Sequence, residues 1–241
     1  MSALRSLLAT ALLLPACAAV APPPPPEEAP PAAAAPGSPV APGFPAPDRL
    51  EEGDRWFVAV RADGGREPLA ERHRRRRFGD LVREEVVWDR TFAGLAAAEH
   101  GTAQVFALTL DGKGLGVSLL DADGRPLGEP ALELAAPYRV GTSWTVEGAG
   151  GSIACRIEAL EETDTPAGKA KALRVSHRGG DAEGMTMLTW YDAGLRPVRS
   201  EVRRGGARGA LVEARAALAS PEPSPEECRA AVEWARKNLG R

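Results

Sequence analysis

From Arg49 onward the chain consists of short runs in which apolar and polar residues alternate, with turn residues between them. Alternation with a period of two is typical of β-strands, because successive side chains point to opposite faces. The predicted strands are Trp56–Arg61, Asp80–Phe92, Thr102–Leu110, Leu115–Leu120, Thr142–Glu147, Ile153–Glu161, Lys169–His177, Met185–Tyr191, Pro197–Arg203 and Ala210–Leu218. Short turns such as Asp111-Gly112-Lys113-Gly114 force antiparallel neighbours. We therefore expect a mainly β fold, an antiparallel meander that forms a curved sheet, half-barrel or sandwich.

One helix is predicted at the C-terminus, over residues 225–239, packed on this sheet. Ser224 is the expected N-cap, Pro225 occupies the first turn, and Glu227 completes a capping box. A helical period places four apolar side chains on one face: Cys228, Val232, Ala235 and Leu239.

The N-terminus has the pattern of a secretory signal peptide, predicted over residues 1–16. Arg5 supplies a positive charge, and Leu7–Leu14 form an apolar run that is too short to span a bilayer, which needs ~20 residues. The run ends in Leu14-Pro15-Ala16-Cys17, which resembles a bacterial lipobox. That resemblance implies that Cys17 is acylated and becomes the mature N-terminus. The alternative is an ordinary signal peptide cleaved near Ala18 or Ala19.

Residues 17–48 are predicted to be the lipidated cysteine and a disordered, proline-rich tether. Twelve of the 22 prolines lie in residues 22–47, and proline removes backbone donors and excludes helix. An extended polyproline spacer of this length would reach on the order of 80 Å, at ~3.1 Å per residue. Residues 49–241 then form a single extracytoplasmic β-rich domain. Resemblance to lipoprotein sorting rules places the anchor, through Ala18, in the outer membrane, facing the periplasm or the cell surface.

The formal net charge of −3 argues against a nucleic-acid partner, which favours a strongly basic face. The basic run at residues 72–77 is a local exception. It could contact anionic lipid headgroups through Arg72, Arg74, Arg75, Arg76 and Arg77, at ~1 kcal/mol per basic residue. The favoured alternative is a solvated loop or helix face balanced by nearby acidic residues, which are Glu67, Glu71, Asp80, Glu84 and Glu85.

Two further cysteines fall on apolar faces, Cys155 on a predicted strand and Cys228 on the predicted helix. In an oxidising compartment this arrangement favours a Cys155–Cys228 disulfide that clamps the helix to the sheet. The alternative is two buried thiols that act as small hydrophobic residues.

No catalytic motif is found: the chain has no GxSxG elbow, HExxH pair or Walker loop. The cysteines and the three histidines, His73, His100 and His177, show no metal-ligand spacing. Gly112-x-Gly114-x-Gly116 is predicted to be a hairpin, because a strand follows it. We predict a protein that is not an enzyme and that has no metal or cofactor, although a spatial triad leaves no trace in residue spacing.

Residues 138–204 carry three motifs in a row. They are Tyr138-x-Val140-Gly141-x-x-Trp144, the turn Glu161–Gly168, and Trp190-Tyr191-Asp192-Ala193-Gly194. This series resembles the TapB-like domains, a group of uncharacterised secreted β-proteins. The resemblance covers under a third of the chain and implies only a secreted, antiparallel β-domain, because that group has no established catalytic residues.

Two functions are favoured over a third alternative, a hydrolase with an unrecognised site. The first is a membrane-tethered, non-enzymatic binding or scaffold domain of the cell envelope, with its N-terminal lipid in the membrane and a protein partner. The second is a carrier of lipids or other apolar ligands in a cavity of the curved sheet. An apolar cavity inside the sheet would favour the second function.

Overall fold

The computed structural model describes residues 43–45, 47–61, 69–79, 81–89, 101–148, 151–179, 184–218 and 222–239. The predicted signal peptide, Cys17, most of the predicted tether and His100 lie outside the described residues. Within the described part of the chain, no helix is both long enough and apolar enough to cross a membrane.

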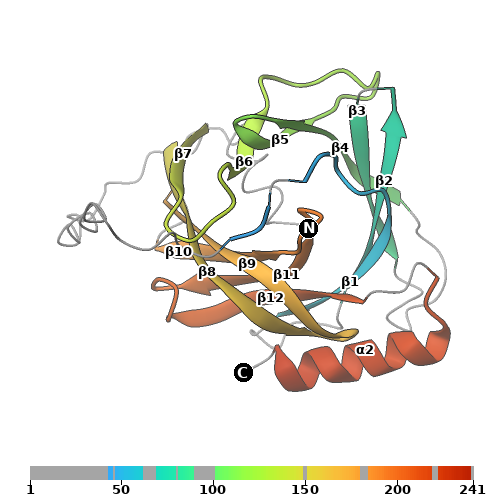
Figure 1. The fold of residues 1–241 in the computed structure, drawn as a ribbon. Coiled ribbons are helices and arrows are strands. Elements are labelled where there is room, and N and C mark those ends of the chain that lie inside the picture. Colours follow the sequence, from blue (N-terminus) through green and yellow to red (C-terminus); the bar gives the residue numbers. More distant parts are fainter. Residues whose placement is uncertain are drawn as a thin grey trace, which may run out of the picture.

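Twelve strands in the described ranges form one antiparallel sheet (Figure 1). They are β1 (Gly53–Arg61), β2 (Leu69–Phe78), β3 (Leu81–Asp89), β4 (Gly101–Asp111), β5 (Gly114–Leu119), β6 (Ala131–Ala135), β7 (Ser143–Gly148), β8 (Gly151–Thr165), β9 (Gly168–Gly179), β10 (Met185–Tyr191), β11 (Pro197–Arg204) and β12 (Ala210–Leu218). Their order is β6-β5-β4-β3-β2-β1-β12-β11-β10-β9-β8-β7. The predicted class, a mainly β antiparallel meander, is confirmed.

The path of the chain explains how this sheet curls. It starts in the middle at β1, runs outward to the edge strand β6, crosses to the other edge at β7, and returns to β12, which pairs with β1. The edges β6 and β7 meet along a line that we call the seam, where Trp144 Nε1 donates to the carbonyl oxygen of Leu132 at 2.9 Å. No strand pairing joins β6 to β7 among the described residues. The sheet is therefore a nearly closed barrel.

Two strands were not predicted, β2 and β6. The strand β2 contains the basic run, and the side chains that it points into the barrel are Glu71, His73 and Arg75, so the apolar alternation that marks a strand is absent. The strand β6 has only five residues, too few for a clear pattern. The turns between predicted strands agree with the structure: Asp111 Oδ1 accepts hydrogen bonds from the backbone N–H groups of Lys113 and Gly114 in the β4–β5 hairpin.

The two faces of the barrel pack against different partners. The largest apolar cluster fills one part of the interior, where Leu134, Ile157 and Leu173 are fully buried. A second cluster lies on the outer face of β1 and β12, where Trp56, Val58 and Ala216 pack against the C-terminal helix. Alternation along each strand supplies both faces, because neighbouring residues point in opposite directions.

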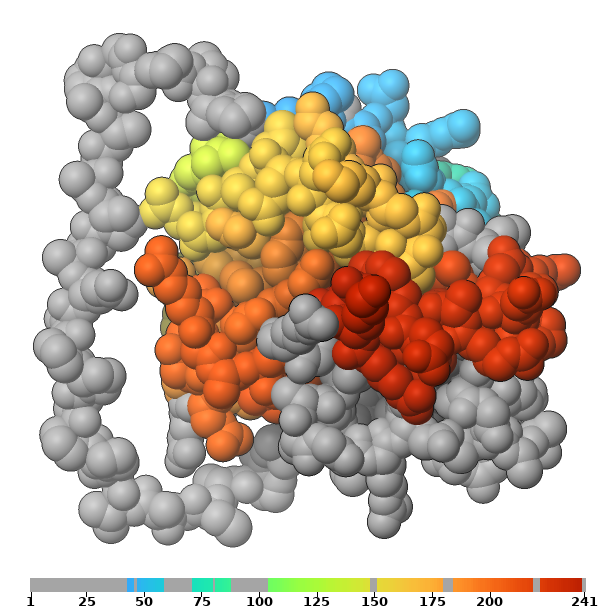
Figure 2. Space-filling view, turned by 90° about the horizontal axis from the view of Figure 1, so that it is seen from below, coloured from blue at the N-terminus to red at the C-terminus, as the bar shows by residue number. Residues whose placement is uncertain are grey.

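The helix α2 (Pro225–Asn238) begins as predicted. Ser224 accepts from the backbone N–H of Glu227, and the Glu227 carboxylate accepts from the backbone N–H of Ser224 at 2.7 Å. The bond from the Ser224 backbone N–H to the carboxylate holds the pKa of Glu227 below its usual value. Figure 2 shows α2 on the outer surface of the barrel, where Ala231 and Ala235 face the sheet.

The predicted Cys155–Cys228 disulfide is wrong, because the sheet separates the two residues. Cys155 pairs across strands with His177, and His177 pairs with Met187, which lines the interior, so Cys155 lies on the inner face. Cys228 lies on α2, outside the barrel, where its Sγ donates to the carbonyl oxygen of Pro223 at 3.7 Å. Each cysteine is on an apolar face, as predicted, but the faces are different ones.

Candidate functional site

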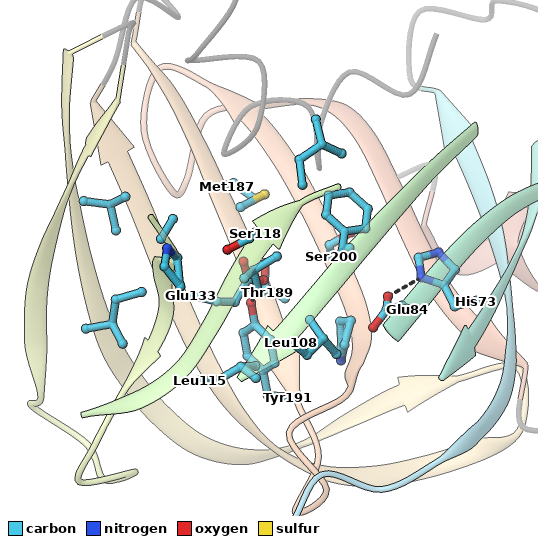
Figure 3. A pocket seen from close by; sticks show the side chains of 18 of the residues that line it. His73, Glu84, Leu108, Leu115, Ser118, Glu133, Met187, Thr189, Tyr191 and Ser200 are labelled. Atoms are coloured by element: carbon cyan, nitrogen blue, oxygen red, sulfur yellow. Dashed lines mark hydrogen bonds and ion pairs between the residues drawn. The ribbon is translucent and has the colours of Figure 1, made fainter. Parts of the chain in front are cut away.

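A cavity of about 700 Å³ lies inside the barrel (Figure 3). This volume is within the ~300–1,000 Å³ typical of small-molecule sites. Its walls include residues of both edge strands, Leu132 on β6 and Val146 on β7, so the cavity lies directly behind the seam. Leu127, in the loop before β6, also lines the cavity and is 53% exposed. The cavity therefore reaches the surface beside this leucine.

Most of the cavity wall is apolar, because the strands β4, β5 and β10 turn alternate apolar residues inward. Phe106 and Leu108 come from β4, Leu115 and Val117 from β5, and Met187 from β10. The cross-strand pair Leu108–Val117 shows that these side chains share one face of the sheet. This wall can hold an aliphatic chain out of water.

Hydroxyl and carboxyl groups interrupt this wall. Ser118 and Thr189 lie near the middle of the view in Figure 3, and Ser200 lies beside them. The Tyr191 hydroxyl donates to Glu133 Oε1 at 2.7 Å, which joins β10 to β6 across the interior. The cavity can therefore hydrogen-bond a polar group as well as hold an apolar chain.

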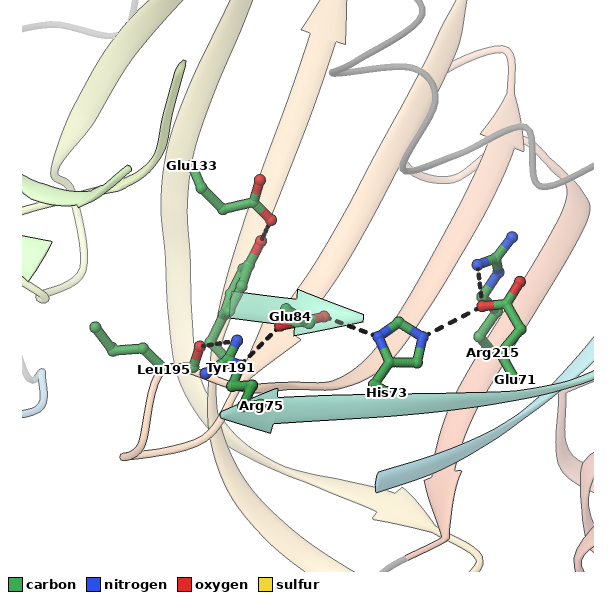
Figure 4. A network of polar contacts seen from close by, with 8 residues as sticks. All are labelled: Glu71, His73, Arg75, Glu84, Glu133, Tyr191, Leu195 and Arg215. Atoms are coloured by element: carbon green, nitrogen blue, oxygen red, sulfur yellow. Dashed lines mark hydrogen bonds and ion pairs between the residues drawn. The ribbon is translucent and has the colours of Figure 1, made fainter. Parts of the chain in front are cut away.

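One wall of the cavity carries a buried group of ionisable side chains, which we call the charged cluster: Glu71, His73, Arg75, Glu84 and Arg215 (Figure 4). His73 lies between two carboxylates, with Nδ1 2.8 Å from Glu84 Oε1 and Nε2 3.3 Å from Glu71 Oε2. Arg215 Nη1 donates to Glu71 Oε2 at 2.8 Å. The ring of Phe57 packs against His73, with centroids 4.5 Å apart.

Arg75 completes the charged cluster. Its Nε donates to Glu84 Oε2 at 2.7 Å and its Nη2 to the carbonyl oxygen of Leu195 at 3.2 Å. Its Nη1 is buried and has no hydrogen-bond partner among the described residues. Arg75 is 4% exposed and lines the cavity. A buried charge is tolerated only when it is paired, so the Arg75–Glu84 pair fixes both side chains in this wall.

The basic run divides between the two faces of β2. Arg72 and Arg76 point outward and pair with Asp54, and Arg77 pairs with Glu52. The pKa of Asp54 is lowered, because the hydrogen bonds and positive charges of Arg72 and Arg76 outweigh the effect of its burial. Arg74 lies farther from Asp54, with its Nε 3.9 Å from Asp54 Oδ2. Anionic-surface contact by these four arginines remains a prediction.

For Arg75 the predicted contact with an anionic surface is wrong, because its side chain is enclosed within the barrel. The alternative, a solvated loop or helix face, also differs from the structure, because the run lies on a strand. Its acidic partners are Asp54 and Glu52 on the outside and Glu71 and Glu84 on the inside. Sequence reasoning missed the charged cluster. A signal was present in Glu71-x-His73-x-Arg75, which a strand places on one face.

Cys155 and His177 form a second buried pair, with Sγ 3.4 Å from Nδ1. Burial, and to a smaller degree the charge of Glu133, raises the pKa of the Cys155 thiol to about 12. Burial also lowers the pKa of His177 to about 4. At neutral pH both groups are therefore uncharged, whereas a cysteine nucleophile reacts as the thiolate.

His73 has no ring nitrogen left for a hydroxyl nucleophile, because each nitrogen faces a carboxylate. A serine triad needs one imidazole nitrogen for its carboxylate and the other for the hydroxyl. Within the described ranges, no group of three or more His, Cys, Asp or Glu residues is arranged to hold a metal ion. The wall of the cavity is therefore apolar for most of its area, with the charged cluster on one side and the carboxyl groups of Glu129, Glu133 and Glu147 elsewhere in its lining.

No family model and no curated protein matches the chain. Among solved structures it is similar to a protein of Bacteroides fragilis described as a "putative exported protein with YmcC-like fold", at 17% sequence identity and a TM-score of 0.43. The match covers 73% of this chain and 97% of that one. A similarity at this level carries no argument about ligand or activity, and the resemblance of residues 138–204 to TapB-like domains stays a prediction.

Proposed function

We propose that this chain is a non-enzymatic binding protein of the bacterial cell envelope, and that its barrel holds a lipid or another ligand with an apolar chain. The observation that carries the proposal is the cavity of about 700 Å³ behind the seam, with its walls of Phe106, Leu108, Leu115, Val117 and Met187. A protein that acted only through its outer surface would gain nothing from an open interior, since close packing of that space would stabilise it.

Burial of the ligand's apolar part would drive binding, at ~0.8 kcal/mol for each methylene group removed from water. An alkyl chain along the wall formed by β4 and β5 would exchange water contacts for contacts with leucine and valine side chains. The opening beside Leu127 gives such a chain a route inward, because this leucine joins the outer surface to the cavity wall.

The sequence upstream of the barrel fits a carrier attached to a membrane. A lipid on Cys17 would hold the chain at the membrane, and the proline-rich segment over residues 22–47 would let the barrel reach away from it. Anchor and tether together would confine the barrel to the space next to the membrane, where lipids are available to it.

Mass spectrometry of lipids that copurify with the protein tests this proposal. The protein is expressed with Cys17→Ala, so that its own anchor is absent, and is purified from the native envelope without detergent. We expect a lipid at about one equivalent per chain. Protein that is folded and carries no lipid or other apolar molecule would contradict the proposal.

A cavity-filling variant locates the ligand. Val117→Trp adds bulk to the cavity wall, whereas Lys171→Trp adds the same side chain at an exposed position of β9. We expect Val117→Trp to lower the amount of bound lipid at least tenfold and Lys171→Trp to leave it unchanged. Circular dichroism checks that both variants are folded. Equal lipid content in the two variants would place the ligand outside the barrel.

A further inference from the structure

We infer that the ligand of the cavity carries an anionic headgroup, a carboxylate or a phosphate, and that the guanidinium of Arg75 binds it. This inference rests on the proposed function and names the chemical class of the ligand. The observation behind it is the Nη1 atom of Arg75, which has no hydrogen-bond partner among the described residues.

The unpartnered nitrogen of Arg75 belongs to a side chain that is buried in the cavity wall. The side chain is 4% exposed and lines the cavity, so bulk water does not solvate it. Nε and Nη2 are held by Glu84 and by the carbonyl oxygen of Leu195, which fixes the plane of the guanidinium. Nη1 is then a preorganised donor. A buried polar group left unsatisfied costs about 1–3 kcal/mol, more when it is charged, and an oxygen of the ligand would remove that cost.

The carboxylate beside Arg75 is already occupied. Glu84 Oε1 lies 2.8 Å from His73 Nδ1 and its Oε2 accepts from Arg75 Nε, so both of its oxygens are engaged. In the rest of the charged cluster, Glu71 Oε2 accepts from Arg215. Arg215 also pairs with Glu213, through Nε at 2.8 Å from Oε1. The Nη1 group of Arg75 is therefore a donor that remains available in this wall. A guanidinium donor binds carboxylate or phosphate oxygens.

The rest of the cavity indicates what the headgroup is attached to. The charged cluster forms one wall, and the apolar side chains of β4 and β5 form another. A ligand that satisfies both walls is an amphiphile, with its anion at Arg75 and its alkyl chain along Leu108 and Leu115. Fatty acids and lipids with a terminal phosphate share this chemistry.

Competition binding with four probes that share one alkyl chain tests the inference. Dodecanoate, dodecyl phosphate, dodecanol and dodecylamine displace a neutral fluorescent apolar dye from the Cys17→Ala protein after its native ligand is removed. We expect at least one of the two anions to bind tenfold or more tightly than dodecanol. The anion that competes at the lower concentration identifies carboxylate or phosphate as the headgroup.

A paired substitution assigns the preference to Arg75. Arg75→Gln combined with Glu84→Gln removes both charges of the pair, so that no buried carboxylate is left alone. The matched control is Arg199→Gln with Glu201→Gln, which removes an ion pair on the outer face, where Arg199 Nε donates to Glu201 Oε1 at 3.1 Å. We expect the inner pair variant to bring anion and alcohol within twofold of each other, chiefly by weakening binding of the anions, and the outer pair variant to keep the preference.

The outcomes separate this inference from the proposed function. If neither the dye nor any of the four probes binds, the proposed function fails. If dodecanol binds but the anions bind no more tightly, or if dodecylamine binds best, the cavity is an apolar site and the inference is overturned. An anion preference that survives in the inner pair variant also overturns it. The wild-type comparison tests the preference for an anion even if the inner pair variant does not fold.

Discussion

At the scale of single residues, the barrel wall holds ionisable side chains in two different ways. Those of the charged cluster are kept in place by each other's charges, as in the pairing of Arg75 with Glu84. For His177, by contrast, the structure shows no ion pair among the described residues. Its Nδ1 faces the uncharged thiol of Cys155, its Nε2 has no hydrogen-bond partner among the described residues, and burial lowers its pKa to about 4.

This lowered pKa predicts loss of stability in mild acid. Above pH 6.5 His177 is neutral in both the folded and the unfolded chain. As the pH falls from 6.5 to about 4, the unfolded chain takes up a proton that the folded chain does not, so the free energy of unfolding decreases, by on the order of 3 kcal/mol. Urea unfolding at pH 7.5, 6.5, 5.5 and 4.5 measures this decrease. His177→Asn should flatten that part of the curve, and parallel curves for the two proteins would contradict the assignment.

At the scale of elements, the seam is the junction of the described sheet that lacks a strand pairing. Its edge strands are joined by the hydrogen bond from the Trp144 indole to the carbonyl oxygen of Leu132 rather than by a strand pairing. Because the cavity lies directly behind it, opening of the seam would widen the route to the interior.

Trp144→Phe should loosen the seam, because phenylalanine keeps the ring but lacks the donor. Loss of about 1 kcal/mol at this contact predicts roughly fivefold faster amide exchange in β6 and β7. Trp190→Phe is the matched control, since the Trp190 indole donates to Glu161 on the outer face at the same distance of 2.9 Å. Hydrogen exchange followed by mass spectrometry measures both variants. Equal rates in Trp144→Phe and the wild type would show that the indole does not hold the seam.

The helix α2 offers a second test at this scale. Ala231 is buried against β1 and β12, whereas its neighbour Ala230 is exposed. Ala231→Gln overfills the contact and should lower the free energy of unfolding by about 1–3 kcal/mol. Ala230→Gln should change it by less than about 0.5 kcal/mol. Thermal or urea unfolding compares the two variants, and equal effects would mean that α2 does not pack on the barrel through this face.

At the scale of the whole molecule, the expected function depends on the barrel and on the N-terminal segment together. Cys17→Ala removes the predicted site of acylation without touching the barrel. We expect the wild type to incorporate radiolabelled palmitate and to fractionate with membranes, and the variant to be unlabelled and released into the periplasmic fraction. An ordinary cleaved signal peptide would instead give unlabelled, released protein in both cases.

Much of the local structure can be read from the sequence. Alternation and turn residues identified ten of the strands, and the capping residues Ser224 and Glu227 located the start of the helix. These signals are local, because strand faces, turns and helix caps depend on residues only a few positions apart. The strand β2 was not predicted for the same reason. Its inward side chains are ionisable rather than apolar, and the residues that pair with them lie elsewhere in the chain.

The tertiary structure decided what the inside of the molecule contains. Alternation placed Cys155 on an apolar face, but only barrel closure showed that this face is the interior and that α2 covers the opposite one. The charged cluster joins Glu71 to Arg215, 144 residues apart, and the seam joins strands at opposite edges of the sheet. Such contacts depend on how the whole sheet curls, which short-range propensities do not determine. The sequence by itself therefore determined the strands, the turns and the helix, whereas closure of the sheet created the cavity and brought its charges together.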